Sequence, residues 1–174
     1  MSVVLLGYRG SGKTTLGRAL AERLGRPLID TDERIVAKAG DSIKTIFETQ
    51  GETAFRNLEA QALAEALGAE DAIISIGGGA VLRAENRALL MTAGERIYLR
   101  CDPVVLAQRI HADPGTAANR PALTHLGGTV EEIISLLEVR EPLYREVATA
   151  ELDVTDLSAE QALALTLELL DRDD

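Results

Sequence analysis

A glycine-rich segment that ends in a lysine and a threonine is the first feature of the sequence with evident chemistry. The segment Gly7-Tyr8-Arg9-Gly10-Ser11-Gly12-Lys13-Thr14 matches the pattern G-x-x-x-x-G-K-[ST] at every fixed position. Glycines let successive backbone N–H groups converge on phosphate oxygens, and a helix that begins near Lys13 adds the positive end of its dipole. The residues that we expect to bind nucleotide phosphates are Gly10, Ser11, Gly12, Lys13, Thr14 and Thr15.

Two side chains of this loop have expected roles of their own. Lys13 would reach the β and γ phosphates as a catalytic cation, and the Thr14 hydroxyl would ligate Mg²⁺ beside them. The alternative is a glycine-rich turn that only caps a helix. A short apolar run before the loop and a helical pattern after it favour phosphate binding, because the motif requires that context.

Other nucleotide-binding patterns do not fit. The dinucleotide pattern G-x-G-x-x-G fails because Thr15 stands where its third glycine belongs. The guanine-reading sequence N-K-x-D of GTPases is absent, since no asparagine of the chain is followed by lysine. A mononucleotide remains, and we expect ATP.

Two carboxylates, Asp30 and Asp32, follow the second apolar run. Residues two apart on an extended strand project to the same side, and ligands of open parallel sheets bind at the carboxyl ends of the strands. One carboxylate could support Mg²⁺ while the other accepts a proton from an attacking hydroxyl. Capping of the next helix by Asp30 or Thr31 is the alternative.

Glycines and arginines form the remaining candidates. Gly77-Gly78-Gly79 follows a buried apolar run, so a ligand could approach the backbone N–H groups there, although a flexible turn would read the same way. Arg56 lies one turn before Glu59, which could orient it, and Arg120 and Arg140 stand elsewhere in the chain. For each arginine taken alone a solvated surface charge is the simpler explanation, and their recurrence near predicted strand ends of an acidic chain is what makes them candidates.

The elements that must position these residues alternate along the chain. Apolar runs at 3–6, 27–29, 72–76, 96–99 and 151–154 predict five buried strands. Helical spacing or capping signals between them predict helices from about 13 to 24, from 55 to 67, after Asp102-Pro103 and from Ser158 to about Leu170. This order predicts a three-layer α/β/α sandwich around a five-stranded, mainly parallel sheet. Residues 111–128 show little periodicity and predict a long loop that acts as a lid.

Composition limits the remaining possibilities. A chain of 174 residues fits one domain spanning residues 1–174. The formal charge of -10 argues against nucleic acid and anionic membranes as partners, so an anionic ligand needs a local basic pocket. No apolar run is long enough to span a bilayer and no secretory segment is evident, so we expect a cytoplasmic protein. The single cysteine, Cys101, excludes an internal disulfide.

From Val3 to about Leu170 the chain resembles the shikimate kinase family of P-loop kinases. The residues that carry the resemblance are Gly7 to Thr15, Asp30-Thr31-Asp32, Gly51-Glu52, Phe55-Arg56 with Glu59, Gly77 to Val81, Arg120-Pro121 and Arg140 to Tyr144. The resemblance implies ATP-dependent phosphorylation of the 3-hydroxyl of shikimate, a step toward chorismate and the aromatic amino acids, with Mg²⁺ as cofactor. It also implies that the working form is a monomer.

The resemblance assigns roles residue by residue. It implies that shikimate is bound by Asp32, Arg56, Gly78, Gly79 and Arg140. It implies a lid arginine over the ATP phosphates in Arg120, which we count with Lys13 and Asp32 as catalytic, and a carboxylate on the magnesium side in Asp30. The chain departs from the family in a lid rich in Ala and Gly and in residues 155–158, which lack the common Arg and Pro. A match of Arg109 to an adenine-contacting arginine rests on an ungapped alignment.

Two other functions remain as alternatives. Another small-molecule kinase of the same build, acting on gluconate or a nucleoside monophosphate, would not need Asp32, the three glycines and two arginines together. A noncatalytic ATP-binding module would not need intact Lys13, Thr14 and Asp32.

Overall fold

The computed structural model describes residues 1–115 and 128–171. Its centre is a five-stranded sheet with strand order β2-β3-β1-β4-β5, in which every neighbouring pair is parallel. The strands are β1 (Val3–Leu6), β2 (Leu28–Asp30), β3 (Ile73–Ser75), β4 (Glu95–Arg100) and β5 (Ala150–Asp153). The predicted strands and the parallel sheet are confirmed.

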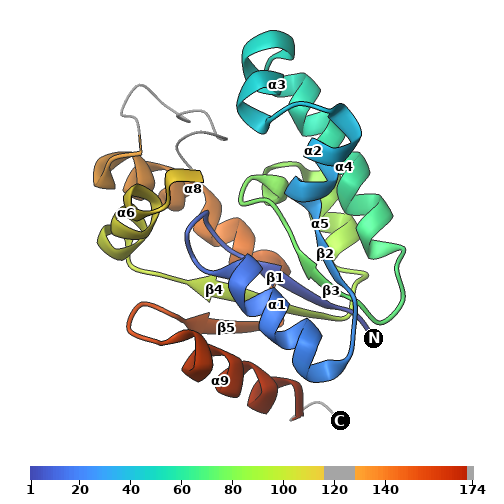
Figure 1. Ribbon diagram of the computed structural model, residues 1–174, viewed down its shortest axis with the longest axis vertical. Coiled ribbons are helices and arrows are strands. Elements are labelled where there is room, and N and C mark those ends of the chain that lie inside the picture. The colour runs from blue at the N-terminus through green and yellow to red at the C-terminus, as the bar shows by residue number, and fades with distance from the viewer. Residues whose placement is uncertain (116–127, 172–174) are drawn as a thin grey trace.

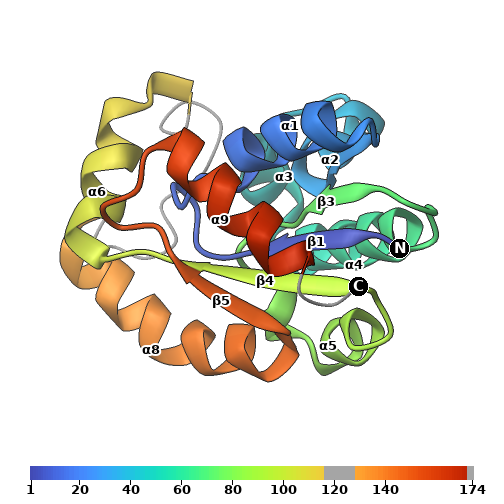
Figure 2. The same ribbon diagram turned by 90° about the horizontal axis from the view of Figure 1, so that it is seen from below.

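Helices cover both faces of the sheet, so the three-layer prediction is also confirmed. Helices α1 (Lys13–Leu24) and α9 (Ala159–Asp171) pack side by side on one face, while α4 (Glu52–Leu67), α5 (Ala84–Leu90) and α8 (Val130–Val147) cover the other (Figures 1 and 2). Helix α6 (Pro103–Ala112) packs against α8. All four residues of β1 are at most 2% exposed, as expected for a central parallel strand covered on both sides.

A smaller second core lies beyond the sheet. Helices α2 (Thr31–Ala39) and α3 (Ile43–Gln50) pack on α4 and extend past the strand ends, as Figure 1 shows. The buried residues of this core are Ile35, Ile43, Ile46, Phe55 and Ala62. Because α4 contributes to this core and also covers the sheet, it holds the outer helices beside the carboxyl edge of the sheet.

The predicted helix ends follow local chemistry. Gly25 ends α1 in the left-handed conformation with φ of 65°, and Asp102 caps α6, whose first residue is Pro103. At α9 the Gln161 N–H donates to Ser158 Oγ at 3.1 Å and the Ser158 N–H donates to Gln161 Oε1 at 2.9 Å. These two bonds form the capping box that the sequence predicts.

Several features differ from the sequence-based expectations. Helices α3, α5 and α8 and the short 3-10 helix η1 (Ala80–Leu82) were not predicted. The apolar period of α8 is interrupted by the buried Arg140 and by Pro142, a residue that normally ends a helix. The predicted lid begins two residues too early, since His111 and Ala112 belong to α6. Most of that segment, with Arg120, lies outside the described residues.

Among the described residues, no helix is long and apolar enough to span a membrane.

Candidate active site

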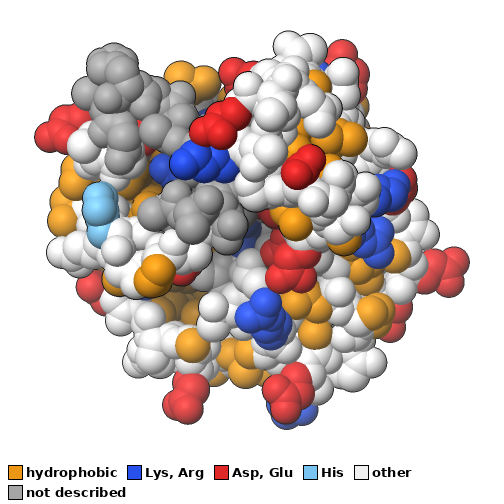
Figure 3. Space-filling view, turned by 45° about the horizontal axis from the view of Figure 1, so that its top comes forward, with side chains coloured by type: hydrophobic (Ala, Val, Ile, Leu, Met, Phe, Trp, Pro, Cys, Tyr) orange, Lys and Arg blue, Asp and Glu red, His pale blue; other side chains and the backbone are white. Residues whose placement is uncertain are grey.

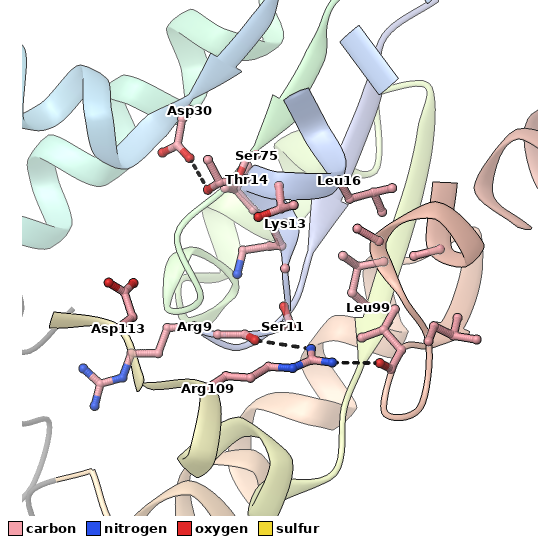
Figure 4. A pocket seen from close by; sticks show the side chains of 18 of the residues that line it. Arg9, Ser11, Lys13, Thr14, Leu16, Asp30, Ser75, Leu99, Arg109 and Asp113 are labelled. Atoms are coloured by element: carbon pink, nitrogen blue, oxygen red, sulfur yellow. Dashed lines mark hydrogen bonds between the residues drawn. The ribbon is translucent and has the colours of Figure 1, made fainter. Parts of the chain in front are cut away.

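A cavity of about 440 Å³ opens at the carboxyl ends of the strands, beside the glycine-rich loop. It is lined by residues 9–16 of the loop and α1, by Asp30 and Asp32, and on the far side by Arg109, Val154, Leu157 and Ser158. Figure 4 shows Lys13 and the hydrogen-bonded pair Thr14 and Asp30 on one side, and Arg109 on the other. The size and the loop both suit a nucleotide.

The loop leads into α1 at the wall of this cavity. Gly12, with φ of 94°, precedes α1, and no described side chain caps that helix. The first N–H groups of α1 are therefore available to an anion. Gly7 has φ of 146°, and a Cβ there would lie 2.8 Å from the Leu99 carbonyl oxygen, so both conformation and space require glycine.

Lys13 folds back over the loop. Its ammonium donates to the carbonyl oxygens of Gly7 at 2.8 Å and Tyr8 at 2.9 Å, and the residue is only 9% exposed. These contacts hold the cation at the mouth of the loop, where the terminal phosphates of a nucleotide would lie.

Asp30 is the cap that the sequence left as an alternative, and its second oxygen makes a further contact. Its Oδ1 accepts from the N–H groups of Asp32 and Glu33 at 3.0 and 3.2 Å, so it is the N-cap of α2. Its Oδ2 accepts from Thr14 Oγ1 at 2.8 Å. Because Thr14 donates its proton to Asp30, the oxygen lone pairs of Thr14 remain available to a hard cation.

The donor set fits a cation that is held mainly by phosphate oxygens and water. Thr14 and Asp30 supply a hydroxyl and a carboxylate oxygen, the ligand types that Mg²⁺ prefers. No group of three or more His, Cys, Asp or Glu in residues 1–115 and 128–171 is arranged to hold a metal by itself.

Asp32 lies in α2 and not on the strand, so the premise that Asp30 and Asp32 share one strand is wrong. β2 ends at Asp30, and Thr31 begins α2. The carboxylate of Asp32 still lines the nucleotide cavity and also a second, smaller cavity beside it. Both carboxylates therefore face the site, although a helix rather than the strand pleat positions the second one.

The second cavity is rich in arginine. It is lined by Arg9, Asp32, Ile43, Phe47, Phe55, Arg56, Glu59, Gly77, Gly78, Gly79 and Arg140. Arg56 is 8% and Arg140 6% exposed, so neither is the solvated surface charge that remained possible from the sequence. Buried guanidinium groups that line a cavity favour an anionic ligand with a planar, two-oxygen group.

Glu59 holds Arg56 in place, as the spacing predicted. Arg56 Nη1 donates to Glu59 Oε2 at 2.7 Å, and Glu52 lies 3.6 Å from Arg56 Nε. Burial raises the pKa of Glu59, and the neighbouring guanidinium of Arg56 opposes that rise. A charged pair in this position costs desolvation energy, and because the pKa of Glu59 stays raised, the contact with Arg56 offsets that cost only in part.

Two of the three glycines, Gly77 and Gly79, give room to the protein's own charged groups, while Gly78 lies against the Gly7 carbonyl oxygen and the Tyr144 hydroxyl. A Cβ at Gly79 would overlap the Arg56 guanidinium, and a Cβ at Gly77 would lie 2.8 Å from Asp32 Oδ1 and from Glu59 Oε1. None of the three has positive φ, so space rather than backbone flexibility explains these glycines. The expected open approach to their N–H groups is only partly available, because Gly77 N already donates to Thr31 Oγ1 at 3.2 Å.

Arg140 contacts the ring of Tyr8, and its neighbour Tyr144 connects α8 to the glycine segment. The Arg140 Cζ lies 5.7 Å from the ring centroid of Tyr8, a distance suited to a cation–π contact. Tyr144, one turn further along α8, donates to the Gly78 carbonyl at 2.5 Å. Burial raises the pKa of Tyr144, so its hydroxyl keeps its proton and remains a donor. The loop of Tyr8, the glycine segment and α8 are thus connected behind the second cavity.

Arg9 was missed as a site residue because it occupies a variable position of the loop motif. It lines both cavities, as Asp32 does. Figure 3 shows basic and acidic side chains gathered around a hollow on this face. The only available signal was a cation next to the phosphate-binding glycines.

Arg109 also lies at the nucleotide cavity. Its Nη2 donates to the Val154 carbonyl at 3.1 Å, and its Nη1 lies 3.5 Å from the Gly10 carbonyl. The position agrees with a contact to the base, which stays a prediction. So does the role of Arg120, which falls outside the described residues.

A phosphate-binding loop at the carboxyl edge of this parallel sheet, next to a cavity with buried arginines and a carboxylate, defines a P-loop kinase. The family model for shikimate kinase matches residues 9–171. The chain belongs to the shikimate kinase family.

Individual relatives agree with this assignment. A shikimate kinase from Burkholderia thailandensis is 45% identical over 85% of this chain and 78% of its own length. One from Enterococcus faecalis is 41% identical over 97% of this chain and 98% of its own. A solved shikimate kinase from Acinetobacter baumannii, in complex with shikimate, superposes with a TM-score of 0.92 at 36% identity and covers 99% of this chain and 94% of its own. A gluconokinase from Sinorhizobium meliloti, at 24% identity and a TM-score of 0.63, shares the fold.

Proposed function

We propose that this protein transfers the γ-phosphoryl group of ATP to the 3-hydroxyl of shikimate, a reaction of the pathway to chorismate and the aromatic amino acids. The observation that carries the proposal is the pair of buried arginines, Arg56 and Arg140, beside Asp32 in a cavity that adjoins the phosphate-binding loop. The high similarity to a kinase solved with shikimate supports the choice of acceptor.

The protein binds the acceptor with cations at the carboxylate of the ring and with an anion at its hydroxyl groups. Arg56 and Arg140 hold the ring carboxylate through charge-assisted hydrogen bonds. Gly78 and Gly79 line the same cavity beside the ring, and Gly79 leaves the space that the Arg56 guanidinium needs. Asp32, on the side shared with the nucleotide cavity, contacts the ring hydroxyls and brings the 3-hydroxyl toward ATP.

Transfer then forms one bond and breaks one. The 3-hydroxyl oxygen attacks the γ-phosphorus, the bond from that phosphorus to the β–γ bridging oxygen breaks, and Asp32 accepts or orients the hydroxyl proton. Lys13 and the N–H groups of residues 10–15 stabilise the charge on the transferring group and on the ADP that leaves.

Mg²⁺ is the proposed cofactor, with Thr14 as ligand and Asp30 beside it, either directly or through water. When bound, it neutralises charge on the phosphate oxygens. Arg120 is proposed to add a further cation when the segment around it closes over ATP, which would also exclude water as a competing acceptor. We further propose that the chain is a single domain, acts as a monomer and works in the cytoplasm.

The test is ADP production from ATP and Mg²⁺ with shikimate, gluconate, quinate or AMP as the acceptor. Of the four acceptors, we expect only shikimate to be turned over. The control is Lys13→Met, which should fold but should be slower by orders of magnitude. Preferred turnover of gluconate or AMP would mean another small-molecule kinase. ATP binding without acceptor-dependent ADP release would mean a noncatalytic module.

A further inference from the structure

Arg9 and Asp32 stand where the two cavities meet. They are the two residues, among those that the structure describes, that line both cavities. A group that moves from a nucleotide in the larger cavity to an acceptor in the smaller one therefore passes near these two side chains. A cation at this junction can therefore act on the terminal phosphate itself.

Such a cation needs a fixed position, and burial alone does not supply one. The Arg9 side chain is 10% exposed, and a guanidinium removed from water is stable only beside compensating charge or hydrogen bonds. Glu132, in the first turn of α8, is completely buried, and its Oε2 lies 3.9 Å from Arg9 Nη2. This carboxylate supplies negative charge on the side of Arg9 away from bulk water.

The carboxylate of Glu132 is itself held by backbone. The Glu132 N–H donates to Thr129 Oγ1 at 3.3 Å, and Glu132 Oε2 accepts from the Gly128 N–H. Gly128 has φ of 80°, and a Cβ there would lie 3.5 Å from Arg9 Nη2, so this turn is packed against the guanidinium. The first turn of α8 thus joins Glu132 to Arg9 as one unit.

We infer that Glu132 is a positioning residue for phosphoryl transfer, which acts by holding the Arg9 guanidinium at the junction of the two cavities. The inference rests on the proposed function for its kinetic consequence. The competing role for Glu132 is that of a cap, because its contact to Gly128 resembles half of a capping box. Positioning Arg9 requires the negative charge of Glu132, whereas capping requires only an oxygen that accepts a hydrogen bond.

Glu132→Gln separates them, since glutamine keeps an oxygen that can accept from Gly128 but loses the charge that faces Arg9. We expect kcat to fall by about 10-fold or more and the KM values to change little, with the melting temperature near that of the wild type. The exposed neighbour Glu131 offers a matched control, and Glu131→Gln should leave kcat unchanged. Wild-type kcat in Glu132→Gln, or a loss of kcat only in proportion to melting, would overturn the inference.

A double-mutant cycle identifies Arg9 as the intermediary. Arg9→Met should lower kcat at least as much as Glu132→Gln, and adding Glu132→Gln to Arg9→Met should have no further effect. Independent, multiplying losses would mean that Glu132 acts elsewhere, and the inference would be wrong.

Nucleotide affinity provides a reading that does not need shikimate turnover. A cation at the junction contacts the terminal phosphate of a nonhydrolysable ATP analogue but has no such partner in ADP. The ratio of the ADP Kd to the analogue Kd should therefore fall in Arg9→Met and in Glu132→Gln. In the double variant the ratio should be the same as in Arg9→Met. If the wild-type protein does not turn over shikimate, the proposed function is refuted, but the two Kd values can still be measured and compared. An unchanged ratio in the variants overturns the inference, whatever the acceptor is.

Discussion

At the scale of single residues, Asp30 and Asp32 divide two tasks. Asp30 caps α2 with one oxygen and accepts from Thr14 with the other, whereas Asp32 faces both cavities. Changes at Asp30 are therefore expected to lower the stability of α2 and to disturb the proposed magnesium site, whereas changes at Asp32 are expected to lower turnover without loss of stability.

Asp32→Asn should lower turnover by ~10² or more, the usual scale for a positioned acid or base, while shikimate binding survives better. Because Asp32 is not the cap of α2, the melting temperature of the Asp32→Asn variant should stay near that of the wild type. Turnover and melting measured on one preparation decide the point. Glu33→Gln removes an exposed charge one residue away and should be neutral in both assays. A destabilised but fully active Asp32→Asn would remove Asp32 from the catalytic residues.

Arg56→Ala and Arg140→Ala should each weaken shikimate binding by about 10- to 100-fold, the equivalent of the ~1.5 to 3 kcal/mol of a charge-assisted contact. The Kd for ATP should change little, since neither arginine lines the nucleotide cavity. Titration of both ligands on each variant is the measurement. Equal losses for shikimate and ATP would indicate a general loss of structure or a different clamp.

At the scale of elements, the turn after β3 and helix α4 form one unit. The space that Gly79 leaves is filled by the Arg56 guanidinium, which Glu59 on the same helix holds in place. Changes in either element should therefore be transmitted to the acceptor cavity.

Gly79→Ala should displace that guanidinium, because a Cβ has no room beside it. We expect the KM for shikimate to rise, the KM for ATP to stay within a few-fold, and the free energy of unfolding to fall by about 1–3 kcal/mol, as for other overpacked sites. Gly68→Ala, at the end of α4, is the control: its Cβ would meet nothing closer than 3.5 Å. An unchanged KM for shikimate in Gly79→Ala would show that the Arg56 position does not matter.

The pH dependence of stability should report the burial of Glu59. Its pKa is raised in the folded chain, so the folded state binds more protons than the unfolded state between the two pKa values. The contribution of Glu59 to the free energy of unfolding is therefore complete below the pKa that this carboxyl has in the unfolded chain. It is lost as the pH rises through the pKa of Glu59 in the folded protein. Relative to Glu59→Gln, the wild type should lose stability as pH rises, measured by urea unfolding from about pH 4 upward.

Glu65, on the same helix, provides a control of opposite sign. Its hydrogen bond to Lys38 lowers the pKa of this carboxyl, so its contribution is present at higher pH and is lost as pH falls. A difference between the wild type and Glu59→Gln that is flat, or that follows the Glu65→Gln direction, would contradict the account of Glu59.

At the scale of the whole molecule, the charge of -10 is distributed unevenly. Lys13, Arg9, Arg56 and Arg140 gather around the two cavities, as the expectation of a local basic pocket in an acidic chain requires. Both cavities are built on one sheet edge, and α4 connects the main core to the smaller one.

If residues 1–174 form one cooperative domain, ATP and shikimate should raise a single melting transition. Each ligand at 100 times its Kd adds about 2.7 kcal/mol, which corresponds to roughly 5 to 10 °C for a chain of this size. Thermal scans with each ligand and with both provide the measurement. Two transitions that respond to different ligands would divide the chain into separate units.

Local sequence determined much of this protein. The phosphate-binding loop, the five strands and the caps at Asp102 and Ser158 were predictable, because glycine spacing, apolar period and capping chemistry act over a few residues. Helix α8 was not predictable in this way, since a buried arginine and an internal proline interrupt its pattern. For Arg56 the only local signal was Glu59 one turn later, and Arg140 had no local signal that separated it from a surface charge.

Tertiary structure decided the rest. The strand order brings the ends of β1, β2 and β3 to one edge, and there Arg9 and Asp32 meet from segments that no local pattern connects. The same packing buries Arg140 against Tyr8, places the Arg56 guanidinium in the space beside Gly79, and joins Glu132 to Arg9. These contacts link residues far apart in the chain, and their energy depends on burial, which exists only once the sheet and its helices have packed.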